Sequence, residues 1–187
     1  MKTYWIIVSL LLIVSCSKNK TKEKTELNKI LHAVLKYKSD WETPNNNIFL
    51  VNPKLRQLKI RVPSQKEILG EEPPPPPVFN TNIVRLLDLR NSQSAERKTD
   101  SLNLLKQEKY IFDSIIIDDK INPNIRLANK DDVHNSIELY QFSNPIYFND
   151  RFVYIELIHH DYGFGFLLEK QKDGSWIVKE SVNTFIT

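Results

Sequence analysis

Hydrophobic residues in the carboxyl-terminal third of the chain occur in short runs, which are separated by residues that favour turns. The four runs are rich in aromatic and β-branched residues and cover residues 146–148, 152–159, 164–170 and 176–181. Such runs are typical of β-strands. Asn149-Asp150 and Asp173-Gly174 lie between them, and the second pair is typical of a type I′ hairpin turn. We therefore predict an antiparallel β-meander, with helices from earlier in the chain covering one face.

A different spacing predicts one helix near the amino terminus. Its hydrophobic residues recur at intervals of three and four positions, and they are Leu27, Ile30, Leu31, Val34 and Leu35. This spacing places them on one side of an amphipathic α-helix. We expect the helix to begin near Thr25, to end near Ser39-Asp40 and to pack its apolar side on the domain.

The middle of the chain contains shorter patterns. In chain order these are residues 48–51 (strand), 58–62 (strand), 64–69 (helical turn), 83–89 (strand or helix), 100–109 (helix) and 110–117 (strand). Leu102 and Leu105 are expected on one side of the helix. All the patterns together predict a single α+β domain over residues 27–187, in which one or two amphipathic helices pack on the antiparallel meander.

Five consecutive prolines, Pro73–Pro77, interrupt this domain. Such a run favours a stiff polyproline II segment about 15 Å long. It could be a recognition ligand for another protein, or a rigid connection between two parts of one domain. We expect the rigid connection.

The first sixteen residues combine one cation, Lys2, with an apolar run over residues 4–14. A run of about eleven residues suits a signal peptide, whereas a membrane-spanning helix needs roughly 20. It ends in Ile13-Val14-Ser15-Cys16, which resembles the lipobox of bacterial lipoproteins. The resemblance implies that residues 1–15 are a signal peptide, that cleavage precedes Cys16 and that the Cys16 thiol is lipidated.

The segment that follows Cys16 is polar and basic. Its four lysines are Lys18, Lys20, Lys22 and Lys24. We expect residues 16–26 to be the lipidated end and a flexible tether, which spans roughly 35 Å when extended. The lysines could also favour anionic lipid headgroups.

Charge and cysteine content exclude several classes of function. Lysine and arginine number 26 and aspartate and glutamate 23, mostly interspersed, so no basic stripe predicts binding to nucleic acid. Cys16 is the only cysteine, which excludes internal disulfides and cysteine-ligated metals. The chain also lacks a Gly-x-Ser-x-Gly nucleophile turn and a phosphate-binding glycine loop, and we expect no cofactor.

His159-His160-Asp161-Tyr162 is the one local cluster of residue types that are used in catalysis. If the preceding strand continues, alternation places His159 and Asp161 on one face and His160 on the other. A His159–Asp161 pair could orient an imidazole as a general base, or supply two metal ligands with His32 or His134 as the third. The alternative, which we prefer, is a hydrogen-bonded histidine at a strand end in a solvated turn.

Two other groups of residues have plain structural interpretations. The paired acids Asp118-Asp119 and Asp131-Asp132 are expected in solvated turns. The aromatic residues of the meander could line a ligand cleft, but a sheet face of this kind is more often core. They are Tyr147, Tyr154 and Tyr162 with Phe148, Phe164 and Phe166.

Four short motifs and a strand follow one another over residues 142–186. They are Phe142-Ser143-Asn144-Pro145-Ile146-Tyr147, the strand 152–158, Gly163-Phe164-Gly165, Lys172-Asp173-Gly174-Ser175-Trp176 and Asn183-Thr184-Phe185-Ile186. This order is similar to that of a group of small uncharacterised lipoproteins from Gram-negative bacteria. The resemblance implies an α+β fold and an envelope location, and no activity. Many members carry a cysteine pair where this chain has residues 159–162, so it implies no disulfide here.

These observations favour a lipid-anchored cell-envelope protein, on the inner or outer membrane and facing the periplasm. We expect it to bind an envelope or exported protein, or a ligand, without catalysis, through its sheet and the 159–165 loop. One alternative is a small hydrolase or metal-dependent enzyme that uses His159 and Asp161. Another is a protective, immunity-type lipoprotein that neutralises an exported toxin.

Overall fold

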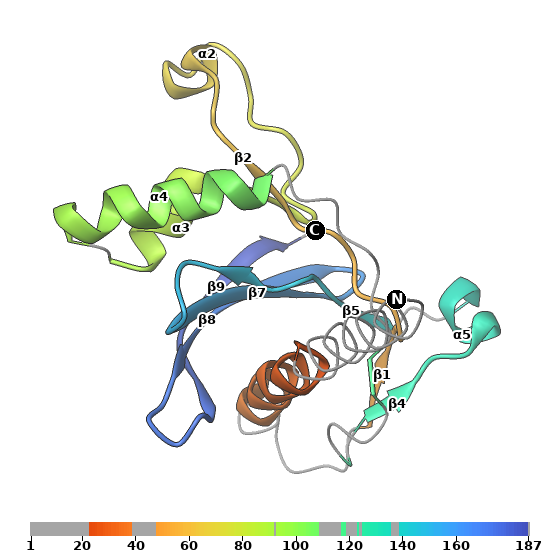
Figure 1. The fold of residues 1–187 in the computed structure, drawn as a ribbon. Helices are drawn as coiled ribbons and strands as arrows, with labels where there is room; N and C mark the ends of the chain where they lie inside the picture. The colour runs from red at the N-terminus through yellow and green to blue at the C-terminus, as the bar shows by residue number, and fades with distance from the viewer. Residues whose placement is uncertain are drawn as a thin grey trace, which may run out of the picture.

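The computed structural model describes residues 23–38, 48–91, 93–108, 117–118, 123, 125–135 and 139–186. The predicted signal peptide, Cys16 and most of the predicted strand over 110–117 lie outside them. The described chain has an α+β fold, in which a mixed sheet lies between helices on both sides (Figure 1). No helix among the described residues is both long enough and apolar enough to cross a membrane.

The central sheet has seven strands in the order β4-β1-β5-β7-β8-β9, with β6 also paired to β7. They are β1 (Phe49–Val51), β4 (Ile125–Leu127), β5 (Leu139–Phe142), β6 (Ile146–Tyr147), β7 (Phe152–Ile158), β8 (Tyr162–Lys170) and β9 (Trp176–Ile186). β1 is parallel to β4 and β5, and all the later pairs are antiparallel. The predicted meander is therefore confirmed, and β1 with β4 adds a parallel part.

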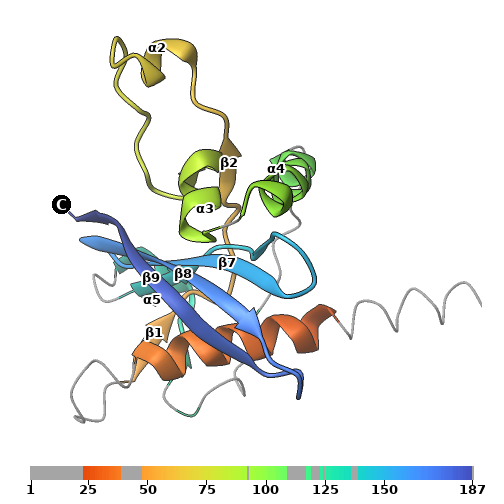
Figure 2. The ribbon, with the colours of Figure 1, turned by 90° about the vertical axis from the view of Figure 1, so that its left-hand side faces the viewer.

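The helix over residues 23–38, here called the N-terminal helix, covers one face of this sheet (Figure 2). Its predicted apolar stripe is confirmed: all five residues are buried, and Ile30, Leu31 and Val34 are fully so. They pack in one core with every second residue of β7. Residues 23–26, predicted to be tether, are helical, and Glu26 bonds to the sheet, so the folded part includes them.

The opposite face is also covered, which corrects the prediction that helices cover one face only. Its elements are β2 (Lys59–Arg61), β3 (Asn80–Asn82), α3 (Ile83–Leu89) and α4 (Ser94–Glu108), of which β2 and β3 pair in parallel. Tyr154 and Ile158 of β7 belong to the core on this side. A strand buried on both faces shows a nearly continuous apolar run, as β7 does, in place of strict alternation.

Helix α4 exposes Leu102 and buries Leu104, so the predicted apolar side was wrong in part. Leu102 is 52% exposed and Leu104 is fully buried, whereas Leu105 is half-buried. Polar contacts explain the orientation, because the Asn103 amide donates to the carbonyl oxygen of Phe148 at 2.7 Å. Helix α4 is mostly polar, so this contact and Leu104 select the side that faces the sheet.

The segment between β2 and β3 contains the predicted helical turn and the five prolines. The turn is α2 (Gln65–Ile68), and Pro73–Pro77 connect it to β3 along an exposed path. The candidate over residues 83–89 is a helix, α3, whose N-cap Asn82 accepts a hydrogen bond from Val84 N at 2.8 Å. An amide side chain at the N-cap satisfies a free helix N–H group, which favours helix over strand here.

Two predicted turns have different structures. Asp131-Asp132 lies in the first turn of α5 (Lys130–Asn135), where Asn129 and Asp132 exchange side-chain to backbone hydrogen bonds of 2.9 and 3.0 Å. This reciprocal bonding is a capping box. The β8–β9 hairpin is no type I′ turn, since only Gly174 has positive φ (80°) in it. Hydrogen bonds between Gln171 and both Gly174 and Ser175 define a three-residue loop with a glycine bulge.

Candidate functional site

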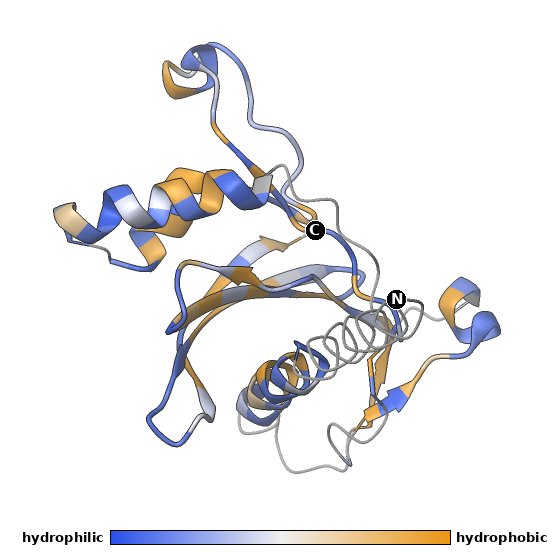
Figure 3. Ribbon diagram, viewed as in Figure 1, coloured by the Kyte–Doolittle hydropathy of each residue, from blue (hydrophilic) through white to orange (hydrophobic). Residues whose placement is uncertain are grey.

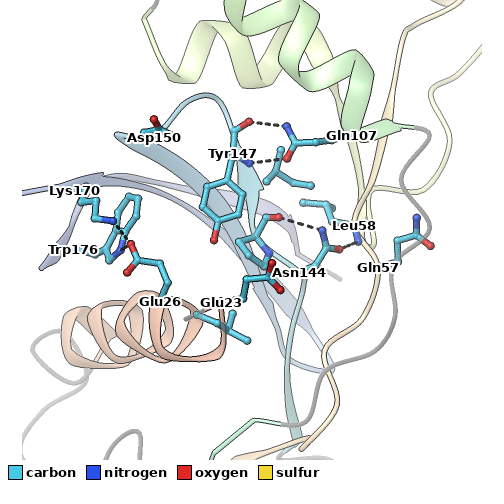
Figure 4. A pocket seen from close by; sticks show the side chains of 13 residues that line it. Glu23, Glu26, Gln57, Leu58, Gln107, Asn144, Tyr147, Asp150, Lys170 and Trp176 are labelled. Carbon is cyan, nitrogen blue, oxygen red and sulfur yellow. Dashed lines mark hydrogen bonds and ion pairs between the residues drawn. The ribbon is translucent and has the colours of Figure 1, made fainter. Parts of the chain in front are cut away.

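A cavity of about 700 Å³ lies between the first described turns of the N-terminal helix, β6 and the hairpin ends of β8 and β9 (Figure 4). Its lining contains carboxylates (Glu23, Glu26, Asp150), one ammonium group (Lys170), amides (Gln57, Gln107, Asn144), aromatic rings (Tyr147, Trp176) and apolar side chains (Leu27, Leu58, Pro145, Ile146). Among the described residues of the lining, three carboxylates are present against one ammonium group, and we call this cavity the anionic pocket.

One wall of the anionic pocket is held by Glu26. Its Oε1 atom accepts hydrogen bonds from Lys170 Nζ and, at 3.0 Å, from Trp176 Nε1. Partial burial acts to raise the pKa of Glu26, but the bonds from Lys170 and Trp176 outweigh it and lower that pKa. Glu26 is therefore ionised at neutral pH and ties the N-terminal helix to the two strands of the hairpin.

The facing wall is β6, which two amides hold in place. Gln107 of α4 accepts from Tyr147 N at 2.8 Å and donates to Tyr147 O at 2.6 Å. Asn144 accepts from Leu58 N at 2.7 Å and donates to Pro145 O. These bonds fix the backbone on both sides of Ile146. The ring of Tyr147 points from this wall into the pocket (Figure 4).

Tyr147 lies within the influence of two carboxylates of the pocket. Burial raises the pKa of the Tyr147 hydroxyl to about 12, and the charges of Glu26 and Glu23 add to the effect. The phenol thus stays neutral and can donate or accept a hydrogen bond. Glu23 and Asp150 are exposed at the margin, where they can meet a ligand's charge without being dehydrated first.

The structure separates the residues of the predicted cluster at 159–162. His159 is 8% exposed, and its ring stacks on Tyr162 and is tilted against Tyr140, with centroid distances of 4.7 and 4.8 Å. His160 and Asp161 are exposed, and their side chains pair with each other. β7 ends at Ile158, so strand alternation does not extend to Asp161. Asp161 Oδ1 lies 2.5 Å from His160 Nδ1, whereas the His159 ring packs against Tyr140 and Tyr162.

The predicted third metal ligands do not join this cluster. His32 lies on the N-terminal helix and His134 on α5, and both are exposed. Within the described ranges, no three histidine, aspartate or glutamate side chains are grouped so that they could hold a metal ion. His159 instead belongs to an aromatic row that continues to Phe164, over which the buried Lys38 ammonium lies at 4.2 Å from the centroid.

The aromatic residues of the meander divide between core and cleft. Tyr154, Phe148 and Phe166 are at most 1% exposed and belong to the core. Tyr147 lines the anionic pocket, and Tyr162 and Phe164 are half-buried at the end of the sheet. The core interpretation is confirmed for Tyr154, Phe148 and Phe166, and the ligand cleft stays a prediction for Tyr147.

A buried carboxyl group lies on the α3 side of the sheet, apart from the pocket. Glu156 is 1% exposed, and its Oε1 accepts from the Tyr154 hydroxyl at 3.0 Å. Burial raises the pKa of Glu156 to about 7, although this hydrogen bond and the charge of Arg85 act to lower it. Glu156 can therefore hold a proton near neutral pH inside the core.

Tyr147 was predicted as a possible cleft residue, whereas no pattern in the sequence predicted a cleft role for the other residues of the pocket. Their segments are up to about 150 positions apart, as Glu26 and Trp176 are, and no local spacing connects them. A signal was present in Asn144-Pro145, which separates β5 from β6 and lines the pocket. Comparison of the chain with protein-family models, with curated proteins and with solved structures finds no match.

Proposed function

We propose that this chain is a lipid-anchored protein of the bacterial cell envelope, which binds a cationic ligand in the anionic pocket without catalysing its conversion. The observation that carries the proposal is the pocket itself, which three carboxylates, a tyrosine ring and several apolar side chains line together. A ligand that fits has a positive charge next to an apolar or aromatic body, as a peptide with lysine or arginine beside phenylalanine does.

The bonding of the pocket supports binding over catalysis. Gln107, Asn144 and Glu26 already use their polar atoms to hold backbone or side chains in place. Their positions are therefore fixed before a ligand arrives, which reduces the entropy lost on binding. The exposed carboxylates of Glu23 and Asp150 can then select the charge of the ligand.

The position of the pocket along the chain supports a ligand close to the membrane. Glu23 follows Cys16 by seven positions (23 − 16), so its distance from a lipid on Cys16 is at most about 25 Å. An anchored protein would then present the pocket to molecules at or near the membrane surface. A segment of an envelope or exported protein is the kind of ligand that meets this condition.

The anchor is tested by metabolic labelling of the full chain with a palmitate analogue. Wild-type protein is expected to be labelled, cleaved before Cys16 and recovered with membranes, and Cys16→Ser to be unlabelled and uncleaved. Ser17→Ala, a neighbouring change outside the lipobox, serves as the control and is expected to behave as wild type. Unlabelled wild type, or equal labelling of Cys16→Ser, overturns the anchor.

The pocket is tested with the soluble chain 17–187, in which Trp41→Phe leaves Trp176 as the single tryptophan. We expect acetyl-Lys-Phe-Lys-amide to change Trp176 fluorescence on titration and acetyl-Glu-Phe-Glu-amide to have no effect. Glu23→Gln and Asp150→Asn should each weaken binding about fivefold at low salt, because an exposed charge pair is worth up to about 1 kcal/mol. Glu72→Gln, outside the pocket, is the matched control.

Two results contradict the pocket proposal without touching the anchor. Equal binding of the two peptides shows that charge does not select the ligand. Unchanged affinity in Glu23→Gln and Asp150→Asn places the binding elsewhere on the protein. Binding through exposed charges should weaken as the salt concentration rises. A peptide affinity that does not change with salt would support either of these two results.

A further inference from the structure

Residues 62–78 form a projection from the domain that we call the arm. It leaves the domain after β2 and returns at β3, on the face of the sheet opposite to the N-terminal helix (Figures 1 and 2). Four of its apolar residues are exposed: Val62 by 56%, Ile68 by 70%, Leu69 by 63% and Val78 by 41%. Figure 3 shows hydrophobic positions on α2, far from either core.

The outward half of the arm is an ordered helix that buries no residue. Ser64 caps its start by accepting from Glu67 N at 3.1 Å. Its end has the paired bonds of a Schellman motif, from Gly70 N to Glu67 O and from Glu71 N to Lys66 O, with Gly70 at φ 74°. Short helices are unstable alone, so caps at both ends are what hold Ile68 and Leu69 in an exposed position.

The returning half of the arm is stiff because of its prolines. Residues 71–78 are all exposed, and five of these eight are Pro73–Pro77. A polyproline II segment is extended before it binds, so little conformational entropy is lost when a partner takes it up.

The base of the arm is fixed to the domain. Arg61, the last residue of β2, forms an ion pair with Glu67 of α2 at 2.5 Å. Phe79, the first residue after the arm, is 4% exposed and has φ 49°, a left-handed conformation that L-residues adopt at a cost. Burial and the Arg56 guanidinium, 5.1 Å from its ring, hold it there. Both halves of the arm thus start from an ordered position.

We propose that the arm is a docking element for another protein, whose groove is lined with aromatic side chains and bordered by lysine or arginine. Pro73–Pro77 fit the aromatic groove, because flat rings pack against the ridges of a polyproline II helix. Glu71 and Glu72 directly precede the prolines and match the basic border. Ile68 and Leu69 fill an apolar hollow beside it.

Charge disfavours two other occupants of the arm. The arm carries Glu67, Glu71 and Glu72 against Lys66, a net charge of −2 (1 − 3), which opposes insertion between anionic lipids. The anionic pocket of a second copy would repel the same carboxylates. A basic groove on a different protein is the occupant that satisfies both the charge and the exposed prolines.

The test uses the full lipidated chain in its bacterial host, with a photoactivatable phenylalanine analogue at Leu69. Ile177 on β9, which is 43% exposed, is the matched position outside the arm. We expect one envelope protein to be crosslinked from Leu69 and not from Ile177, through a segment rich in aromatic and basic residues. That protein is then purified and titrated with the soluble chain 17–187.

Variants of the arm identify the contacts in this titration. Glu71→Lys with Glu72→Lys, and separately Pro74→Gly with Pro76→Gly, are each expected to weaken binding at least about tenfold. Neither pair touches the core. The melting temperature of the glutamate pair should match that of wild type, and that of the proline pair should fall by only a few degrees, because the unfolded chain gains entropy. Glu180→Lys, an exposed charge reversal on β9, should bind as wild type does. This comparison separates loss of the contact from loss of the fold.

Four results overturn the proposal. They are crosslinking of Leu69 to lipid alone, crosslinking to a second copy of this chain, no adduct above that at Ile177, and a captured protein that binds the arm variants as tightly as wild type. None of them bears on the anionic pocket, which shares no residue with the arm.

Discussion

The phenol ring of Tyr154 lies directly over Gly165 on the neighbouring strand, and its hydroxyl takes the space of a Cβ atom at position 165. Gly165 is paired with Glu156, so the same absence of a side chain lets the Tyr154 hydroxyl reach the Glu156 carboxyl. Tyr154 is 1% exposed and has no room to move away. Gly165, Tyr154 and Glu156 therefore depend on one another for their positions in the core.

Gly165→Ala is expected to destabilise the protein by about 3 kcal/mol, because a methyl group cannot be added to this packed contact without displacing the ring. Urea denaturation measures the change. Combining it with Tyr154→Phe removes the nearest atom and should recover part of the loss, as a double-mutant cycle reports. Strictly additive effects would show that the ring and the glycine are not in contact.

The buried Glu156 carboxyl should make the free energy of unfolding fall as pH rises from about 4.5 to about 7. Its pKa is raised to about 7 when folded, against 4.5 for the free side chain, so in this range the native state holds a proton that the unfolded state has lost. Stability therefore falls with increasing pH, by about 3 kcal/mol in all. Glu156→Gln is expected to remove this slope and to be more stable than wild type at neutral pH.

The measurement is the free energy of unfolding of both proteins at several pH values. Glu169, whose pKa is lowered, serves as the control position, because Glu169→Gln should leave the slope between pH 4.5 and 7 unchanged. A wild-type protein that gains stability relative to Glu156→Gln over this range would show that Glu156 is ionised when folded.

Helix α4 supplies a matched pair of leucines. Leu104→Ala should cost about 3 kcal/mol, since the side chain is fully buried, whereas Leu102→Ala should change stability by less than about 0.5 kcal/mol. The two variants have the same change in helix propensity, so only burial differs. Thermal or urea unfolding checks the difference, and equal losses would mean that both leucines pack on the sheet.

These leucines show where the fold could be predicted and where it could not. The N-terminal helix has a broad apolar stripe, and its spacing alone identified the buried side. Helix α4 has few apolar residues, and its orientation depends on Asn103 and Gln107. Their partners are Phe148 and Tyr147, which lie 45 and 40 positions away. Spacing within a helix contains no information about partners so far away in the sequence.

The same limit applies to the candidate site. Alternation placed His159 on the correct face of β7, where it meets Tyr140, but the strand ends one residue earlier and alternation fails at Asp161. The anionic pocket joins residues from both ends of the domain. Predicting it needs the packing of the N-terminal helix on β8 and β9, which is a tertiary contact.

Substitution of Glu26 tests the contact between the N-terminal helix and the β8–β9 hairpin directly. Trp176 is 6% exposed, so its indole N–H has little access to water, and Glu26→Ala would leave it without this acceptor. We expect a loss of about 2 kcal/mol, with Glu26→Gln losing less because an amide oxygen still accepts from the indole. Lys172→Ala, an exposed change in the same hairpin, is the control and should be neutral.

The pH dependence of the Glu26 contact should have the opposite sign to that of Glu156. The pKa of Glu26 is lowered in the folded state, so its stabilisation is present above pH 4.5 and is lost as pH falls through the lowered value. The gap in unfolding free energy between wild type and Glu26→Gln should therefore close in acid. A gap that stays constant from pH 7 to pH 3 would mean that the charge of Glu26 does not hold the helix to the hairpin, and that neutral hydrogen bonding alone forms this wall of the pocket.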